Sequence, residues 1–326
     1  MKRRDFLSVL AGTAAWPIGV RAQQPAMPVI GFLHQGSSDQ NVERVATFRS
    51  GLSQAGFVEG QNLAIEFRWA DGQFEKLPAL AADLVQRQVA VIATPFSTDA
   101  ALAAKAATKA IPIVFLSSAD PVQIGLVGSL NRPGGNVTGL TTMNTELAPK
   151  RLELLRDLAP NANRYFALIN PTSNLAASFV RDMETAAATL GIHIDILRAS
   201  TDRELETAFA SIPQQSRSVL VSSTDAFFFV RREQIATLAI RYGLPAIFDA
   251  RAYARAGGLM SYAGDEADMM LLTANYTGRI LRGERPADLP VAQPTKFALT
   301  INLKTAKALD LKVPPALLAT ADEVIE

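Results

Sequence analysis

The sequence predicts an α/β protein of two similar lobes, each a doubly wound parallel β-sheet with helices on both faces. Apolar runs of strand length alternate with segments of helical periodicity along the chain, which is the pattern of βαβ units. The length of 326 residues exceeds one ordinary domain, and a hydrophobic content of 48% suffices for two cores. Similar features also recur: Gly56-Phe57 corresponds to Gly191-Ile192, and Ile111-Pro112-Ile113 to Leu244-Pro245-Ala246, at offsets of 135 and 133 residues.

The first half contains four apolar runs of strand length that are joined by helical segments. In the first helical segment, apolar residues recur every three or four positions between Val45 and Ala55, and Gly56 stands where a C-terminal cap belongs. We predict strands at 29–34, 63–69, 89–93 and 113–116, and helices at 45–55, 77–85 and 99–110.

The second half repeats this plan and ends in an additional segment. We predict strands at 165–169, 192–197, 219–221 and 246–248, and helices at 175–190 and 230–242. The segment 259–326 adds a helical stripe from Met269 to Ile280, a proline-marked crossing at 289–294, a strand near 297–301 and a short helix. We expect this segment to cross between the two lobes and complete both of them, so it does not form a third domain.

The composition argues against several classes of function. Cysteine is absent, and the two histidines, His34 and His193, are too few for a polyhistidine metal site. The net charge of +1 argues against a nucleic-acid partner. No phosphate-binding loop, dinucleotide fingerprint, G-x-S-x-G or H-E-x-x-H motif is present. We therefore expect no cofactor, no metal and no enzymatic activity.

The N-terminus has the three-part build of a secretory signal peptide. A basic start, Met1-Lys2-Arg3-Arg4, precedes an apolar run, and Val20-Arg21-Ala22 fits a cleavage site. The string Arg3-Arg4-Asp5-Phe6-Leu7 resembles a twin-arginine export signal, although an ordinary secretory signal remains the alternative. We expect residues 1–22 to be removed after Ala22, and the mature protein to be soluble in the periplasm.

Short polar side chains cluster directly after the predicted strands. In open parallel sheets, the edge at the carboxyl ends of the strands is where ligands bind. The ligand-binding candidates that follow the strands are Ser37, Ser38, Thr94, Phe96, Ser97, Ser117, Ser118, Asp120, Asn170, Thr172, Asn174, Thr224, Asp225 and Asp249.

Two interpretations of these residues stay open. A ligand carboxylate could be held by hydroxyls and helix N-termini, and an ammonium group by Asp120, Asp225 or Asp249. The same residue types are also common helix N-caps, so each could serve only to start a helix. His34, at the end of the first strand, could likewise line the cleft or be structural. The run Phe227-Phe228-Phe229 could stack on an aromatic ligand or pack in the core.

The mature chain resembles the ABC-transporter substrate-binding family that is typified by tryptophan- and tyrosine-binding proteins. The motifs that carry the resemblance include Asp120-Pro121, Asn131-Arg132-Pro133-Gly134-Gly135-Asn136 and Gln293-Pro294-Thr295-Lys296-Phe297. Further similar segments are 106–114, 125–127, 137–139, 150–155, 257–262 and 289–326.

The resemblance implies a type I periplasmic binding fold, with two lobes joined by three crossing strands and ligand in the cleft between them. The crossings, which would form the hinge, fall near 138–142, 260–263 and 291–294. Lobe 1 would comprise 28–140 with 264–290, and lobe 2 would comprise 141–263 with 291–326. A monomer would close around its ligand and dock on permease subunits in the inner membrane, which a cytoplasmic ATPase powers.

The resemblance also suggests a small ligand, an aromatic amino acid or another aromatic or carboxylated compound, whereas a sugar stays open. Two other functions remain as alternatives. The same fold could act as a periplasmic sensor that reports ligand occupancy to a membrane receptor. An exported enzyme could use cleft carboxylates such as Asp120 and Asp225, although no spacing selects them.

Overall fold

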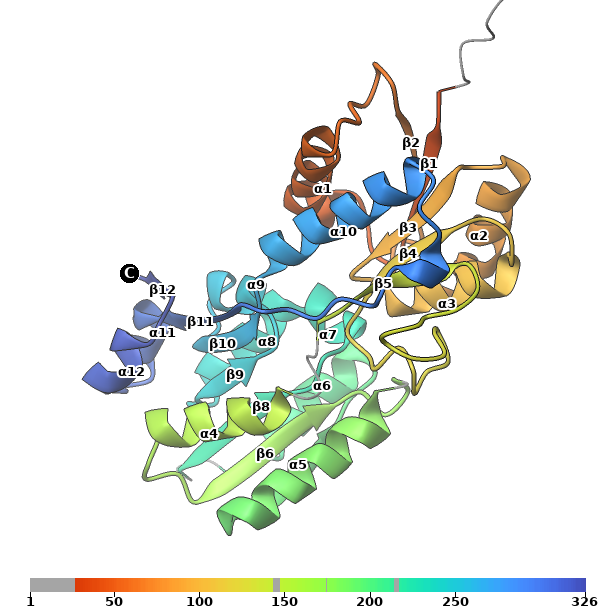
Figure 1. Ribbon diagram of the computed structural model, residues 1–326. Helices are drawn as coiled ribbons and strands as arrows, with labels where there is room; N and C mark the ends of the chain where they lie inside the picture. Colours follow the sequence, from red (N-terminus) through yellow and green to blue (C-terminus); the bar gives the residue numbers. More distant parts are fainter. Residues whose placement is uncertain (1–26, 143–146, 174, 214–216) are drawn as a thin grey trace, which may run out of the picture.

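The computed structural model describes residues 27–142, 147–173, 175–213 and 217–326, which form two β-sheets with helices on both faces (Figure 1). The predicted signal peptide and Asn174 lie outside the described residues. The first sheet, in the order β2-β1-β3-β4-β5, contains β1 (Val29–His34), β2 (Ala64–Trp69), β3 (Val91–Pro95), β4 (Ile113–Ser117) and β5 (Val137–Thr141). The second, in the order β12-β11-β10-β9-β8-β6-β7, contains β6 (Arg164–Ile169), β7 (Ile194–Arg198), β8 (Ser218–Ser222), β9 (Ala246–Phe248), β10 (Met260–Gly264), β11 (Phe297–Asn302) and β12 (Glu323–Ile325).

The predicted α/β class and its internal repeat are confirmed. The order β2-β1-β3-β4-β5 in the first sheet is repeated as β7-β6-β8-β9-β10 in the second. Gly56 and Gly191, with φ of 85° and 66°, end the helices that precede β2 and β7. Pro112 and Pro245 also correspond, because the carbonyl of each accepts a hydrogen bond of 2.9 Å from the neighbouring strand. The weak sequence repeat therefore reflects two copies of one topology.

The second sheet differs from the prediction of a parallel sheet. Strand β11 pairs antiparallel with β10, and β12 then pairs parallel with β11. The reason is topological, because the chain leaves the second sheet after β10, packs a helix on the first sheet and returns from the opposite direction.

The first sheet has an apolar layer on each face. Helices α1 (Val42–Gln54) and α10 (Glu266–Leu281) cover one face, where Phe32, Phe48 and Met269 are buried in one cluster. Helices α2 (Leu77–Gln86) and α3 (Thr98–Ala107) cover the other face. Three short 3-10 helices complete this half: η1 (Asp39–Asn41), η2 (Phe74–Lys76) and η3 (Pro286–Asp288).

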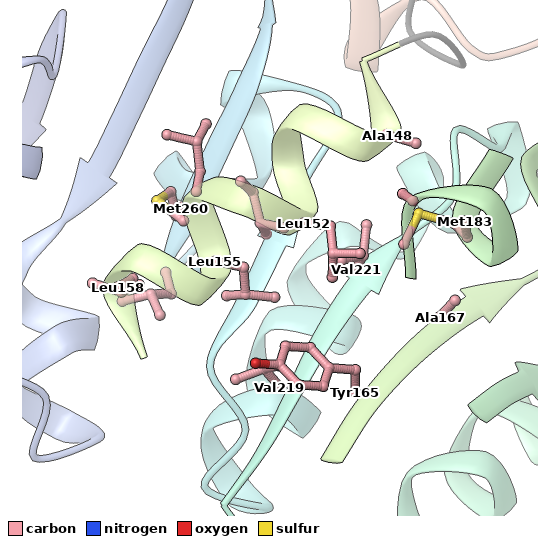
Figure 2. Packing of buried hydrophobic residues seen from close by; sticks show 14 of the residues in the cluster. Ala148, Leu152, Leu155, Leu158, Tyr165, Ala167, Met183, Val219, Val221 and Met260 are labelled. Atoms are coloured by element: carbon pink, nitrogen blue, oxygen red, sulfur yellow. The ribbon is translucent and has the colours of Figure 1, made fainter. Parts of the chain in front are cut away.

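The second sheet is covered in the same manner. Figure 2 shows Leu152, Leu155 and Leu158 of one helix on the side of the sheet where Val219 and Val221 of β8 lie. The helices on this face are α4 (Ala148–Leu158), α5 (Ala176–Leu190), α11 (Leu303–Ala308) and α12 (Pro315–Ala319). The opposite face carries α6 (Asp202–Ala210), α7 (Ala226–Val230), α8 (Arg232–Arg241) and α9 (Arg251–Arg255). Within the described residues, no helix is both long and apolar enough to span a membrane.

Several predicted boundaries were wrong, and local hydrogen bonds explain them. The strand predicted at 89–93 begins only at Val91, because the Val89 amide still bonds to the preceding helix. The helix predicted at 99–110 ends at Ala107, where the Thr108 hydroxyl accepts the next free amides. The helix predicted at 230–242 is α8, which begins at Arg232, and a separate short helix, α7, ends just before it at Val230. Helices α4, α6, α7 and α9 and strand β12 were not predicted as elements, and the single short helix predicted after 297–301 is two helices, α11 and α12.

The chain passes between the sheets after β5, after β10 and before β11 (Figure 1). Strands β5 and β10 are full members of their sheets, so the passages begin where these strands end. The third passage lies against β5, where the Thr141 amide donates to the Ala292 carbonyl at 3.0 Å and the Ala292 amide donates to Gly139 at 3.0 Å.

Helix α10 is held on the first sheet by a close contact with α1, which lies beside it in Figure 1. Small residues permit this approach: a Cβ atom at Gly51 would lie 2.6 Å from the Ala274 Cβ, and one at Gly278 would lie 2.7 Å from the Ala55 Cβ. This contact places the first turn of α10 beside the first turn of α1.

We predict that Gly51→Val destabilises the protein, because the new side chain forces α10 away from α1. The expected loss is about 1–3 kcal/mol in the free energy of unfolding, the usual cost of overpacking. Urea denaturation would measure it, with Ser50→Val on the exposed face of the same helix as the matched control. Equal stability of the two variants would contradict the tight helix contact.

Candidate ligand-binding site

A cavity of about 440 Å³ lies where the carboxyl ends of strands from both sheets meet. Its walls include His34 and Phe96 from the first half and Thr224, Asp225 and Asp249 from the second. A second cavity of about 550 Å³ shares several of these walls, among them Phe96 and Asp225. Volumes of this size are typical of small-molecule sites.

The structure brings half of the predicted ligand-binding residues to these cavities. Those that line one or both are Phe96, Ser118, Asn170, Thr172, Thr224, Asp225 and Asp249. Those that line neither are Ser37, Ser38, Thr94, Ser97, Ser117 and Asp120.

Two of the predicted residues that line neither cavity, Ser97 and Asp120, hold their loops in shape. The Ser97 hydroxyl accepts from the Gln35 amide at 3.1 Å and donates to the Gln35 side chain at 3.0 Å. A carboxylate oxygen of Asp120 accepts from the Val122 and Gln123 amides at 2.8 and 3.2 Å, so this residue forms its own turn. Neither side chain caps a helix, whereas Asp225, which does cap α7, lines both cavities, so the two interpretations do not exclude each other.

His34 forms part of the cavity wall on the first lobe, by which we mean the five-stranded sheet with its helices. Its side chain is only 4% exposed, and its Nδ1 accepts a hydrogen bond of 2.9 Å from the Gly36 amide. Burial, and then the positive charge of Arg44, lowers the pKa of His34 from 6.5 to about 3. The imidazole is therefore neutral at physiological pH.

Arg44 was not predicted from the sequence, yet it lines the cavity. Its guanidinium carbon is 4.5 Å from the ring centroid of Phe96 and 4.6 Å from that of Phe229. Its Nη2 is also 3.1 Å from Glu266 in the first turn of α10. These contacts join α1, the loop after β3, α7 and α10, and they span both lobes. No local motif could reveal them, because the four residues are far apart in sequence.

Phe96 holds a backbone conformation that is unusual for an aromatic residue. Its φ is +52°, in the left-handed region that side chains with a Cβ rarely adopt. Such positions cluster at ligand-binding sites, where the surrounding structure maintains them. The turn directs the Phe96 ring onto Arg44.

Carboxylates from the second lobe, the seven-stranded sheet with its helices, form the opposite wall. Asp225 accepts from the Phe228 amide at 3.2 Å and from Asn170 Nδ2 at 3.2 Å. Burial raises the pKa of Asp225, and burial likewise raises the pKa of Asp249 against the field of Arg151. Burial and then repulsion by Asp225 raise the pKa of Asp99, so these two acids lie near each other across the second cavity.

The two walls therefore differ in chemistry. The first lobe presents a neutral imidazole and a guanidinium that is paired with Glu266, whereas the second presents the carboxylates of Asp225 and Asp249 together with Arg231. This arrangement suits a ligand with an acceptor at one end and a cationic group at the other. In the described part of the chain, no group of three or more His, Asp or Glu side chains could hold a metal ion.

A cavity enclosed by the strand-end loops of two duplicated α/β lobes defines the class of two-lobed ligand-binding proteins. The chain belongs to the ABC transporter substrate-binding protein family, whose family model matches residues 28–325. A tyrosine-binding protein from Clostridioides difficile strain R20291 is 28% identical over 265 residues, which are 81% of this chain and 76% of that protein.

Two solved structures have the same fold. One is a conserved domain protein from Vibrio cholerae, with a TM-score of 0.83 and 27% identity, covering 91% of this chain and 99% of its own. The other is an ABC domain from Streptococcus pneumonia in complex with L-Trp, with a TM-score of 0.83 and 24% identity over the same shares. The type I periplasmic binding fold that the sequence predicted is thereby confirmed.

We predict that Arg44→Lys weakens the contact between the lobes, because lysine keeps the charge but loses the flat surface that stacks on both rings. Each cation–π contact contributes about 0.5–1 kcal/mol, so the free energy of unfolding should fall by about 1–2 kcal/mol. Chemical denaturation would measure this. The control is Arg285→Lys, whose side chain is 77% exposed and pairs with Asp288 at the surface, and equal effects would contradict the stacking role.

The neutral state of His34 predicts a dependence of stability on pH. The unfolded residue takes up a proton near pH 6.5, whereas the folded residue does so only near pH 3, so acid favours the unfolded state between these values. From pH 6 to pH 4, the free energy of unfolding of the wild type should fall by about 1.4 kcal/mol per pH unit more than that of His34→Gln, because glutamine at position 34 does not titrate. Urea denaturation at each pH would measure the difference, and parallel curves would show that His34 is protonated when folded.

Proposed function

We propose that this substrate-binding protein is the receptor component of an ABC importer and captures an amino acid, preferably an aromatic one, between its lobes. The observation that carries the proposal is one cavity that is lined by His34 and by the Glu266-paired Arg44 from the first lobe, and by Asp225 and Asp249 from the second. A zwitterion is complementary to this arrangement, because its carboxylate and ammonium groups meet opposite walls.

The remaining lining supports an aromatic side chain on that amino acid. The rings of Phe74, Phe96, Phe227 and Phe229 line the same cavity as the charged groups. Aromatic rings stack or pack edge to face with one another and exclude water. The names of two similar proteins agree with this ligand class, since one is called a tyrosine-binding protein and the other holds L-Trp.

Hinge closure is the proposed mechanism, with lobe 1 at 28–140 and 264–290, lobe 2 at 141–263 and 291–326, and hinges near 138–142, 260–263 and 291–294. The contact of Arg44 with Phe229 and an ion pair of 3.7 Å between Arg255 and Glu43 connect the lobes on the cavity side. Opening would break these few contacts, whereas the sheets would move as rigid units.

The cellular setting belongs to the same proposal. After export, by the twin-arginine pathway, the monomer would bind its ligand in the periplasm and perform no chemistry on it. The closed form would then dock on inner-membrane permease subunits that a cytoplasmic ATPase powers. Membership of the substrate-binding family supports this order of events.

A thermal-shift screen would test the ligand class. The panel would contain L-tryptophan, L-tyrosine, their analogues without the amino group, branched amino acids and sugars. We expect the aromatic amino acids to give the largest shifts, since a ligand at 100 times its dissociation constant adds about 2.7 kcal/mol of stability. Shifts with sugars but with no amino acid would contradict the proposal.

Asp225→Asn tests the ammonium contact within the same screen. We expect the affinity for the aromatic amino acids to fall about 10–100-fold, because a charged hydrogen-bond partner is lost. The analogues without an amino group should bind as before. Asp120→Asn is the matched control, because it removes the same charge from a turn that lines neither cavity. Equal losses for both ligand types in Asp225→Asn would reject the ammonium contact.

A further inference from the structure

The two nitrogens of the His34 ring have different surroundings. Nδ1 accepts the hydrogen bond from the Gly36 amide at 2.9 Å, so it carries no proton. A neutral imidazole holds its one proton on the other nitrogen. His34 is therefore the tautomer in which Nε2 is the donor.

The Nε2–H group of His34 finds no hydrogen-bond partner among the described residues, although it is shielded from solvent. A buried donor without an acceptor is costly, and such groups in folded proteins call for an explanation. The residue belongs to the wall of the 440 Å³ cavity. An acceptor that enters the cavity would complete this donor.

The loop that holds His34 is preorganised before any ligand arrives. The amides of Asp71 and Gly72 donate to the carbonyls of Gly36 and Gln35 at 3.2 and 2.8 Å. A Cβ atom at Gly36 would lie 3.2 Å from the imidazole, so the turn packs directly on the ring. The ring of Trp69 lies on another side, with 5.4 Å between centroids. The imidazole has little freedom to turn its Nε2 elsewhere.

The surrounding charges select the kind of acceptor. Arg44, which pairs with Glu266 at 3.1 Å, still acts on the imidazole as a positive charge, and this favours an anionic group there. The carboxylates of Asp225 and Asp249 form the opposite wall and would repel an anion. The wall around His34 is therefore the one where the negative end of a ligand would be stable.

We infer that His34 is a specificity-determining ligand contact, whose Nε2–H donates to the carboxylate of the bound amino acid. This inference rests on the proposed function and extends it by assigning one end of the ligand to one residue. Because the donor is a neutral group in a positive field, a carboxylate next to it should bind more tightly than an uncharged or cationic group at the same place.

A pair of substitutions separates the donor from the structural role of the ring. Asparagine at position 34 can still accept from the Gly36 amide but has no group at the Nε2 position. Glutamine can place an amide N–H near that position. Titration calorimetry would compare His34→Asn and His34→Gln with the wild type, using L-tryptophan and L-tyrosine and the amines tryptamine and tyramine, which lack the carboxylate.

We expect His34→Asn to lower the affinity for both amino acids at least tenfold and to change the affinity for the amines less than twofold. His34→Gln should restore most of the amino-acid affinity. Unchanged amino-acid binding in His34→Asn, or equal losses for amines and amino acids, would overturn the inference while leaving the proposed function in place. If the wild type binds the amines as tightly as the amino acids, the carboxylate contact is likewise overturned.

The wild-type protein supplies a second measurement that needs no variant. The sequence has two histidines, and His193, whose side chain is 87% exposed, serves as an internal reference in a ¹⁵N-edited spectrum. The Nε2–H resonance of His34 should move on addition of L-tryptophan or L-tyrosine, and stay in place with the amines. Failure of every amino acid to bind the wild type would instead refute the proposed function, and the inference with it.

Discussion

Parallel strand pairing is the constraint on which the rest of the molecule depends. Two parallel neighbours can be joined only by a crossover that returns the chain to the same edge, so the loops after the strands gather at one edge of each sheet. The strand order reverses between β1 and β3 and again between β6 and β8, which opens a crevice at each edge. Because the topology is duplicated, the two crevices together enclose one cavity, and each half supplies one wall.

Connections between the halves determine how these walls meet. Helix α10 follows β10 of the second sheet but packs on α1 of the first, through contacts as close as Gly51 with Ala274. This packing sets Glu266 beside Arg44, whose guanidinium then lies between Phe96 and Phe229. Helix packing far from the cavity thus controls the position of the charged group within it. The contact between Gly51 and Ala274 and the stacking of Arg44 on the two phenylalanine rings therefore depend on each other.

Burial is the main cause of the pKa shifts on both walls. Desolvation disfavours charge, so it keeps the imidazole of His34 neutral and raises the pKa of Asp225 and Asp249. A ligand that brings the opposite charge to each wall relieves these costs, whereas water in a narrow cavity relieves them less well. Under the proposed function, binding of a zwitterion and closure of the lobes would therefore be favoured together.

Local patterns were sufficient to predict the alternation of strands and helices, the glycines that end the helices before β2 and β7, and the duplicated architecture. They also identified Thr224, Asp225 and Asp249 as residues after strands, because periodicity and turn chemistry act over a few residues. They could not separate Asp225, which faces the cavity, from Asp120, which only forms its turn, since both look like caps in the sequence. Arg44, the antiparallel β10–β11 pair and the tautomer of His34 depend on segments that are 30 to 220 residues apart or on burial. Such features come into being only when the crossovers bring distant segments together and remove them from water.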